Sequence, residues 1–277
     1  MRRVDANPTE EPDWLRDITQ TFSNAVSRVH NLAGAVRTSL QEAEATPRLV
    51  QVLDSMSMST TTTEEAALRL SQATKNAEIA QEEADRNYGT LGAMTVVFYW
   101  AALETFVGDL VLGSLTFDRS TLDNERLSRI KLPASEFLRL DESSRLEWLV
   151  REAERGLGAE LKAGVGRFES VLSLVGLHGD TRDATSRGIY ELQKIRNLVA
   201  HRAGRVDVQF AQACPGLGCD IGSELVVDAQ KSFELVRVTL DYGLTIHARA
   251  VRRFGGNALP GWENTLRDPW EAAPDSG

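Results

Sequence analysis

Residues 196–202 read R-N-L-V-A-H-R and include side chains that are suited to proton transfer and to phosphate binding. Histidine titrates near neutral pH, so His201 could take up a proton and give it back later. The guanidinium of Arg196 could hold a phosphate through two parallel hydrogen bonds and stabilise negative charge that develops on it. Asn197 could hydrogen-bond the same phosphate or orient the imidazole. Arg196, His201 and Asn197 are therefore the candidate catalytic residues.

The segment from about 182 to 202 predicts one helix that carries these residues near its end. Aliphatic residues take one side of this helix, and a narrow polar stripe takes the other, formed by Tyr190, Lys194, Asn197 and His201. Arg196 lies about 140° from His201 around the helix, so its long side chain has to reach towards the stripe. Lys194 and Arg202 could add local positive charge, and Tyr190 adds an aromatic ring, so these three are candidate substrate-binding residues.

The same residues also have a purely structural interpretation. Histidine and arginine side chains near the end of a helix interact favourably with its dipole, and a histidine there can hydrogen-bond the last carbonyl groups. Spacing taken alone favours this interpretation of Arg196 and His201 over a catalytic one. Tyr190 is likewise more typical of a half-buried packing residue than of a nucleophile.

Residues 94–112 form the most apolar segment of the chain and predict a central, buried helix. Its acidic side chains are Glu104 and Asp109. A carboxylate in such surroundings is costly unless it is paired or hydrogen-bonded. We therefore expect Glu104 to cap a loop amide or to pair with an arginine of another helix, which is a supporting role and not a directly catalytic one.

Helical periodicity recurs along most of the chain and predicts an all-α bundle. Pro47 is expected to stop or restart the first long helix, and Gly204 is a suitable left-handed cap for the helix that ends at 202. Two short β-like runs, 206–210 and 225–227, predict either a small hairpin or a plain loop insertion. The remaining predicted helices cover residues 13–46, 66–88, 142–155, 168–177 and 229–253.

The chain is long enough for one main domain with extensions, because no long Pro-rich or Ser-rich linker divides its middle. The predicted organisation is a flexible N-terminus over 1–12, long N-terminal helices over 13–89 that pack on the core, a helical core over 90–254, and an irregular C-terminal tail over 255–277. Trp262 and Trp270 of this tail could dock on the domain.

The pattern of residues 196–202 resembles the HEPN superfamily, whose hallmark is an arginine, a polar residue, a few further residues and a histidine at a helix end. Residues 98–110, FYWAALETFVGDL, look like the family helix that bears a glutamate among hydrophobic residues. The resemblance covers about residues 94–254 and is nearest to larger bacterial members such as the RiboL-PSP-HEPN group. It implies a HEPN-like helical bundle with long N-terminal helices added.

The resemblance also implies an activity, which is RNA cleavage without a metal ion or other cofactor. In that family two protomers oppose their motifs across a dimer cleft, so the chain is expected to be a homodimer with Arg196 and His201 at or near that cleft. A toxin or defence role, with an antitoxin or another protein partner, is one expectation. Because the superfamily also contains binding and assembly modules, a non-catalytic scaffold or a nucleotide-binding module stays open as the alternative.

Composition limits what the chain could bind. Its 277 residues carry a formal net charge of -9, which argues against a general electrostatic grip on nucleic acid, so any RNA contact has to be local. No uninterrupted apolar run approaches the roughly 20 residues that span a bilayer, and residues 1–11 lack the apolar core of a secretory signal. These patterns indicate a cytoplasmic protein that has no membrane partner.

The two cysteines, Cys214 and Cys219, lie in a segment that is typical of a loop. Two ligands cannot complete a zinc site, and no histidine is close in sequence, so no metal is expected there. Reduced loop thiols are the simpler interpretation, and a regulatory disulfide is the alternative. A metal-dependent hydrolase is disfavoured more generally, because no His, Asp and Glu cluster has the spacing of metal ligands.

Overall fold

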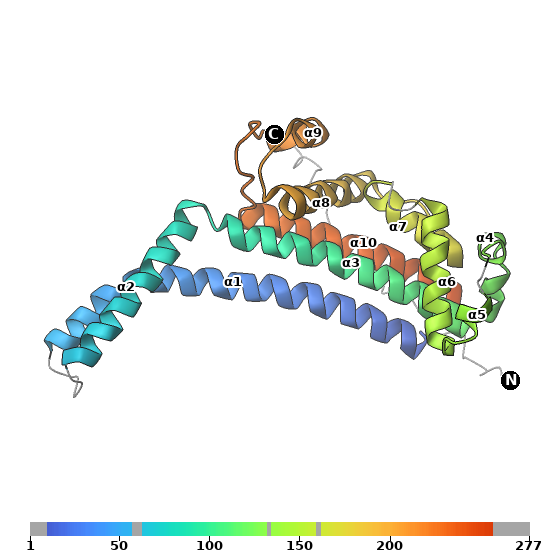
Figure 1. Cartoon of the computed structure of the whole chain (residues 1–277), viewed down its shortest axis with the longest axis horizontal. Coiled ribbons are helices and arrows are strands. Elements are labelled where there is room, and N and C mark those ends of the chain that lie inside the picture. The colour runs from blue at the N-terminus through green and yellow to red at the C-terminus, as the bar shows by residue number, and fades with distance from the viewer. Residues whose placement is uncertain (1–9, 57–62, 132–133, 159–161, 257–277) are drawn as a thin grey trace, which may run out of the picture. The chain divides into compact units, whose positions relative to one another are not determined.

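The computed structural model describes residues 10–56, 63–131, 134–158 and 162–256 (Figure 1). Within these ranges the chain is helical and contains no β-strand, which confirms the predicted all-α class. Most of the predicted flexible N-terminus and nearly all of the predicted irregular tail lie outside the described residues. The longer helices are α1 (Asp13–Ser55), α2 (Thr63–Asp85), α3 (Gly89–Phe117), α6 (Glu142–Leu157), α8 (Asp183–Arg202) and α10 (Ala229–Phe254).

Short helices connect the long ones. They comprise α4 (Glu125–Ser128), α5 (Ala134–Phe137), α7 (Val165–Leu172) and α9 (Val208–Ala213), together with the 3-10 turns η1 (Arg119–Asp123), η3 (Ser173–Val175) and η4 (Pro215–Leu217). Asp141 caps the start of α6 as its sequence suggests, since its carboxylate accepts a hydrogen bond from the Ser144 amide at 2.8 Å.

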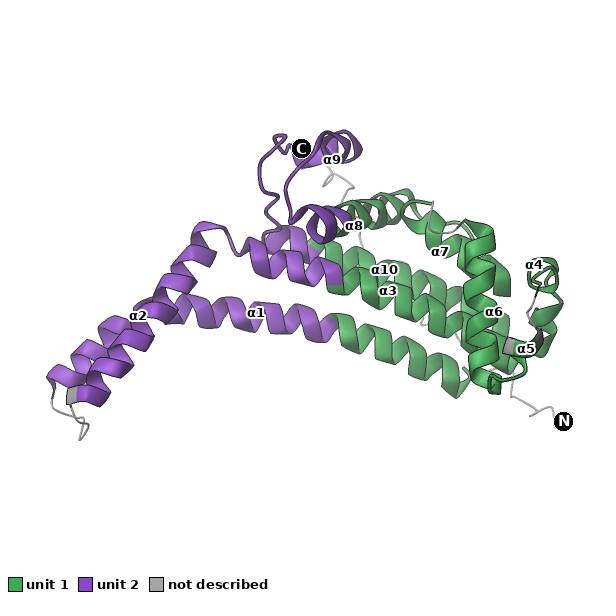
Figure 2. Ribbon diagram, viewed as in Figure 1, with its two compact units in different colours: residues 1–26, 98–196, 234–277 green, residues 27–97, 197–233 purple. Residues whose placement is uncertain are grey.

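The chain folds into two compact units, each of which is built from separate stretches of sequence (Figure 2). Unit 1 contains residues 1–26, 98–196 and 234–277, and unit 2 contains residues 27–97 and 197–233. Helices α1, α3, α8 and α10 therefore each contribute residues to both units. The predicted boundary near residue 90 stays a prediction.

The core of unit 1 is built around α3, in agreement with the central, buried helix that its apolar sequence predicts. Tyr99, Trp100 and Leu110 are almost fully buried. The Trp100 ring lies 4.9 Å from the Phe168 ring, and the Phe106 ring stacks on Phe22 at 4.5 Å. Burial of aromatic rings of this size contributes a large share of the hydrophobic stabilisation of unit 1.

By length and composition alone, α3 is the one helix in the described part of the chain that could cross a membrane. The sequence did not predict such a span, because no uninterrupted apolar run approaches the roughly 20 residues required. However, 44% of its most apolar window is buried inside the protein, and those buried side chains, Trp100 among them, pack on other helices of unit 1. Packing of this kind is typical of a core helix.

The prediction that Pro47 ends or restarts the first helix is wrong, because α1 continues through it to Ser55. A proline inside a helix removes one backbone hydrogen bond and costs about 3 kcal/mol, which neighbouring turns can carry when their other bonds are intact. Thr46, directly before the proline, donates its hydroxyl hydrogen to the carbonyl of Glu42 at 3.2 Å. The low helix propensity of Pro47 is therefore outweighed by the cooperative stability of the long helix around it.

Buried polar groups link α10 to the beginning of α8 within unit 1. The carboxylate of Asp241, only 5% exposed, accepts hydrogen bonds from the Thr185 hydroxyl and the Arg182 guanidinium. A second carboxylate, Glu169 of α7, accepts from the Tyr242 hydroxyl at 2.8 Å and from Arg249 at 2.8 Å. Burial, followed by the nearby charge of Glu169, raises the pKa of Tyr242 well above its usual value.

We expect the substitution Asp241→Ala to lower the free energy of unfolding by about 2–4 kcal/mol. It leaves the buried Thr185 hydroxyl without its acceptor and removes the partner of Arg182. Urea denaturation followed by circular dichroism measures this loss. Asp220→Ala, at an exposed loop position, is the control and should change stability by less than about 0.5 kcal/mol. Equal stability of the two variants would show that the Asp241 network is not stabilising.

Candidate functional site

All the motif residues lie on α8, whose predicted range agrees with the observed one to within one residue. One side of the helix is buried, and its apolar members are Ile189, Leu192, Ile195 and Leu198. The loop before α7 packs closely against this helix. The Gly164 amide donates to the Gln193 side-chain oxygen at 2.7 Å, and a Cβ at Gly164 would lie 3.1 Å from the Tyr190 Cα atom. The position of α8 in unit 1 is therefore fixed by packing and by a buried hydrogen bond.

The division between the units falls inside the motif, between Arg196 and Asn197. Unit 1 contributes Tyr190, Lys194 and Arg196, all of which are half-buried. The ammonium nitrogen of Lys194 lies 5.0 Å from the centre of the Tyr190 ring. This is a cation–π contact between residues one helical turn apart, so the structure brings these two candidate substrate-binding residues together.

Unit 2 contributes the end of the motif. Asn197 is half-buried, whereas His201 and Arg202 are exposed and occupy the last turn of α8. The Arg202 guanidinium lies 3.7 Å from the carboxylate of Asp207, so part of its positive charge is balanced within the chain. The local positive charge expected from Arg202 is correspondingly smaller than its sequence suggests.

The end of α8 is made by two residues in the left-handed region, Ala203 with φ 50° and Gly204 with φ 78°. Gly204 was the expected cap, but the first left-handed position falls on an alanine, which pays a steric penalty there. The Gly204 amide donates to the Leu198 carbonyl at 3.2 Å. His201 thus lies in the last turn of α8, where the helix dipole favours a cation. This position agrees with both the structural and the catalytic interpretation.

The segment that follows α8 corrects one prediction. Residues 208–213 form helix α9 and not a β-run, because Asp207 caps this helix by accepting a hydrogen bond from the Phe210 amide at 2.8 Å. The sequence contained this signal, since aspartate directly before a short apolar run is typical of a helix start. An isolated antiparallel bridge between Arg205 and Glu224 closes the segment between these two residues, which is therefore a loop insertion.

Cys214 is buried and Cys219 is half-buried in this insertion, and no disulfide joins them. The Cys219 thiol lies 3.4 Å from the carbonyl oxygen of Leu217.

Glu104 has the kind of partner that its apolar sequence context predicts. Its carboxylate accepts a hydrogen bond from Arg167 of α7 at 2.7 Å, and the Arg167 guanidinium lies 5.9 Å from the centre of the Trp100 ring. This confirms the expectation that Glu104 pairs with an arginine of another helix. Arg167 itself had no signal in the sequence, because pairs between distant segments leave no local pattern.

We expect Glu104 and Arg167 to be coupled by about 0.5–1 kcal/mol in a double-mutant cycle, since both side chains are about one-third exposed and the pair is screened. The cycle compares Glu104→Gln, Arg167→Gln and the double variant by urea denaturation. A coupling indistinguishable from zero would mean that Arg167 is held by its contact with Trp100 alone.

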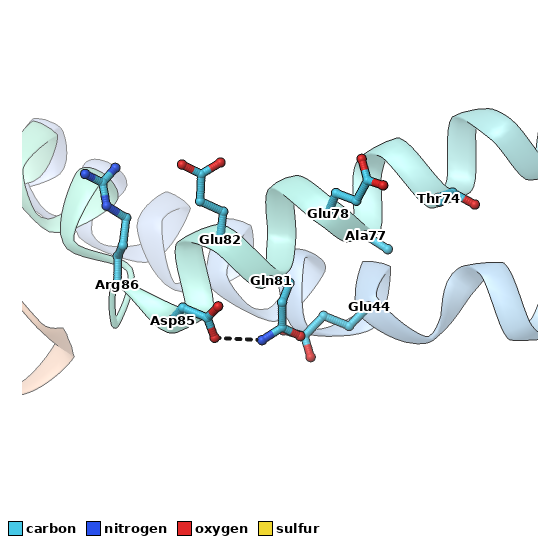
Figure 3. A pocket seen from close by; sticks show the side chains of 8 residues that line it. All are labelled: Glu44, Thr74, Ala77, Glu78, Gln81, Glu82, Asp85 and Arg86. Carbon is cyan, nitrogen blue, oxygen red and sulfur yellow. Dashed lines mark hydrogen bonds between the residues drawn. The ribbon is translucent and has the colours of Figure 1, made fainter.

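A separate groove of about 690 Å³ lies in unit 2 between α1 and α2 (Figure 3). Carboxylates of Glu44, Glu78, Glu82 and Asp85 surround it, with Arg86 at one end. The Gln81 amide donates to Asp85 at 2.8 Å, and Arg86 pairs with Glu224 at 2.8 Å. A lining with this many carboxylates repels phosphate. None of the motif residues belongs to the groove. In the described part of the chain, no three His, Cys, Asp or Glu side chains are grouped so that they could hold a metal ion.

Comparisons of the chain with models of known families, with curated proteins and with solved structures found no match.

Proposed function

We propose that the chain is a HEPN-type endoribonuclease that cleaves RNA without a metal ion, with Arg196 and His201 as its catalytic pair. One observation carries the proposal: His201 is exposed in the last turn of a helix whose polar stripe also holds Asn197 and Lys194. An exposed imidazole can reach a substrate and exchange a proton with it. A buried, hydrogen-bonded histidine would have supported a structural role instead.

In the proposed reaction, His201 removes the proton of a ribose 2′-hydroxyl, and the resulting oxygen attacks the adjacent phosphorus. The bond from phosphorus to the 5′-oxygen breaks, and an imidazolium returns a proton to that oxygen. The products are a 2′,3′-cyclic phosphate and a 5′-hydroxyl, so atoms and charge balance without a co-reactant. Arg196 stabilises the charge on the phosphate, and Asn197 orients it.

The substrate-binding residues act beside this centre. Lys194 supplies a positive charge to the RNA backbone, and the Tyr190 ring, already in contact with Lys194, offers an aromatic surface to a base. The proposal includes a homodimer with the motif at or near its cleft, a cytoplasmic location, and a toxin or defence role in which an antitoxin or other protein would be the partner.

The test is cleavage of a labelled, mixed-sequence RNA in the presence of EDTA. The proposal expects cleavage products that end in 2′,3′-cyclic phosphate. Cleavage that EDTA abolishes would instead indicate a metal-dependent hydrolase. No cleavage of varied RNAs by a folded protein would contradict the nuclease proposal.

A non-catalytic scaffold is the second candidate, and one observation favours it. The part of α1 and α2 that belongs to unit 2 buries alanines, namely Ala33, Ala73 and Ala80, while large aliphatic side chains stay exposed: Leu49, Val52, Leu53, Met56 and Leu68. Exposed apolar side chains in such number are typical of surfaces that bind another protein. The RNA assay separates the two candidates, because a scaffold predicts no cleavage by the wild type.

A further inference from the structure

Three aromatic rings meet in unit 1, and we call them the aromatic corner: Trp14 at the start of α1, Phe117 at the end of α3 and Phe254 at the end of α10. The Trp14 ring lies 5.7 Å from Phe117 and 5.3 Å from Phe254. Gly113 makes room for it, since a Cβ there would lie 2.6 Å from the Trp14 ring. The corner is thus closely packed on its inner side.

The outer side of the corner is incompletely covered. Phe117 is 48% exposed, although its ring belongs to this packed cluster. The indole nitrogen of Trp14 is buried and has no hydrogen-bond acceptor among the described residues. A buried donor without an acceptor costs about 1–3 kcal/mol, so such donors normally have a partner. These two observations together indicate that something else completes the corner.

The last described residues lead the chain to this place. Gly255 and Gly256 have φ values of 105° and 116°, which favour glycine and turn the chain sharply after Phe254. Gly256 lies against the start of α1, because a Cβ there would be 2.9 Å from the Cα atom of Glu11. Residues 257–277 therefore begin next to the aromatic corner.

Residues 257–277 contain large apolar and acidic side chains that could cover the aromatic corner. On an ideal helix its large apolar residues would fall within an arc of about 80°: Leu259, Trp262, Leu266 and Trp270. It carries four acidic residues and one arginine, a net charge of -3, and it follows the exposed Arg252 and Arg253 of α10. Charge and apolar pattern both suit packing against the end of α10.

We propose that residues 257–277 of the same chain dock on the aromatic corner, with Trp262 covering the exposed ring of Phe117. Trp262 is six residue steps beyond Gly256, and an extended chain of this length reaches up to about 20 Å, which is enough to cross the corner. The surface is thereby assigned to an intramolecular partner, and a second copy of the chain is the competing occupant.

Hydrogen–deuterium exchange of the full chain tests this assignment. We compare wild type with a chain that ends at Gly256, with Trp262→Ser, and with Asn264→Ala, which leaves the large apolar residues of the segment unchanged. Residues 12–20 and 110–118 are expected to exchange at least about tenfold faster in the shortened chain and in Trp262→Ser, and at the wild-type rate in Asn264→Ala.

Equal exchange in wild type and Trp262→Ser would overturn the proposal. So would protection that disappears on dilution and does not depend on residues 257–277, because that result would assign the corner to a second copy. If the shortened chain does not fold, the comparison of Trp262→Ser with Asn264→Ala still decides the question.

Discussion

Replacing His201 with alanine is expected to slow RNA cleavage by at least about 10³-fold, because the proposed reaction uses this imidazole for proton transfer at both oxygens. The side chain is exposed at the end of α8, so its removal should leave the free energy of unfolding within about 0.5 kcal/mol of wild type. Initial rates on a labelled RNA in EDTA, together with a urea denaturation curve of the same preparation, measure both quantities.

A matched control is available in the same chain. His178 is also exposed but lies in a loop before α8, so His178→Ala should cleave at the wild-type rate. Arg196→Ala should lose about 10²–10³-fold through the missing phosphate contact, whereas Arg187→Ala, an exposed arginine of the same helix, should lose little. Equal losses in the His178 and His201 variants would attribute the activity to a contaminant or to another site.

The sequence predicted the position of α8 well because its buried and exposed residues alternate with a clear helical period. The contact between Tyr190 and Lys194 follows from the same period, since residues four apart are neighbours on a helix. The exposure of His201 follows from its place on the polar stripe. What the period could not predict is the ion pair of Arg202 with Asp207, which depends on how the chain turns at Ala203 and Gly204.

The rest of the site could not be predicted from the sequence, because it depends on contacts between residues that are far apart along the chain. The apolar sequence around Glu104 predicted that this carboxylate has a partner, but Arg167 lies 63 positions further along the chain. The Asp241 network was missed altogether, since a single aspartate in an amphipathic helix is most often exposed. The division of the chain into two discontinuous units was equally hidden, because it passes through four helices that are each continuous in sequence.

A large loss of stability is also expected from Gly92→Ala in α3. A Cβ at this position would lie 1.8 Å from the carbonyl oxygen of Val227, and backbone cannot move aside as the end of a side chain can. Overpacking of this kind costs about 1–3 kcal/mol, and the displaced segment also carries Ser232, whose hydroxyl is hydrogen-bonded to Thr95 at 3.2 Å. We therefore expect a loss of about 3 kcal/mol, measured by urea denaturation.

The same substitution at Gly108 separates this clash from the effect of alanine on the helix itself. Gly108 is also in α3, but a Cβ there would have no atom within 4 Å. Alanine favours a helix over glycine by up to about 1 kcal/mol, so Gly108→Ala should stabilise the protein while Gly92→Ala destabilises it. Because both variants replace a glycine of α3 by alanine, the sign of the difference between them reports the close approach of Val227 to Gly92. Two stabilised variants would mean that Val227 does not pack on the start of α3 as described, and the segment that connects the end of the motif helix to α10 would then have to lie elsewhere in unit 2.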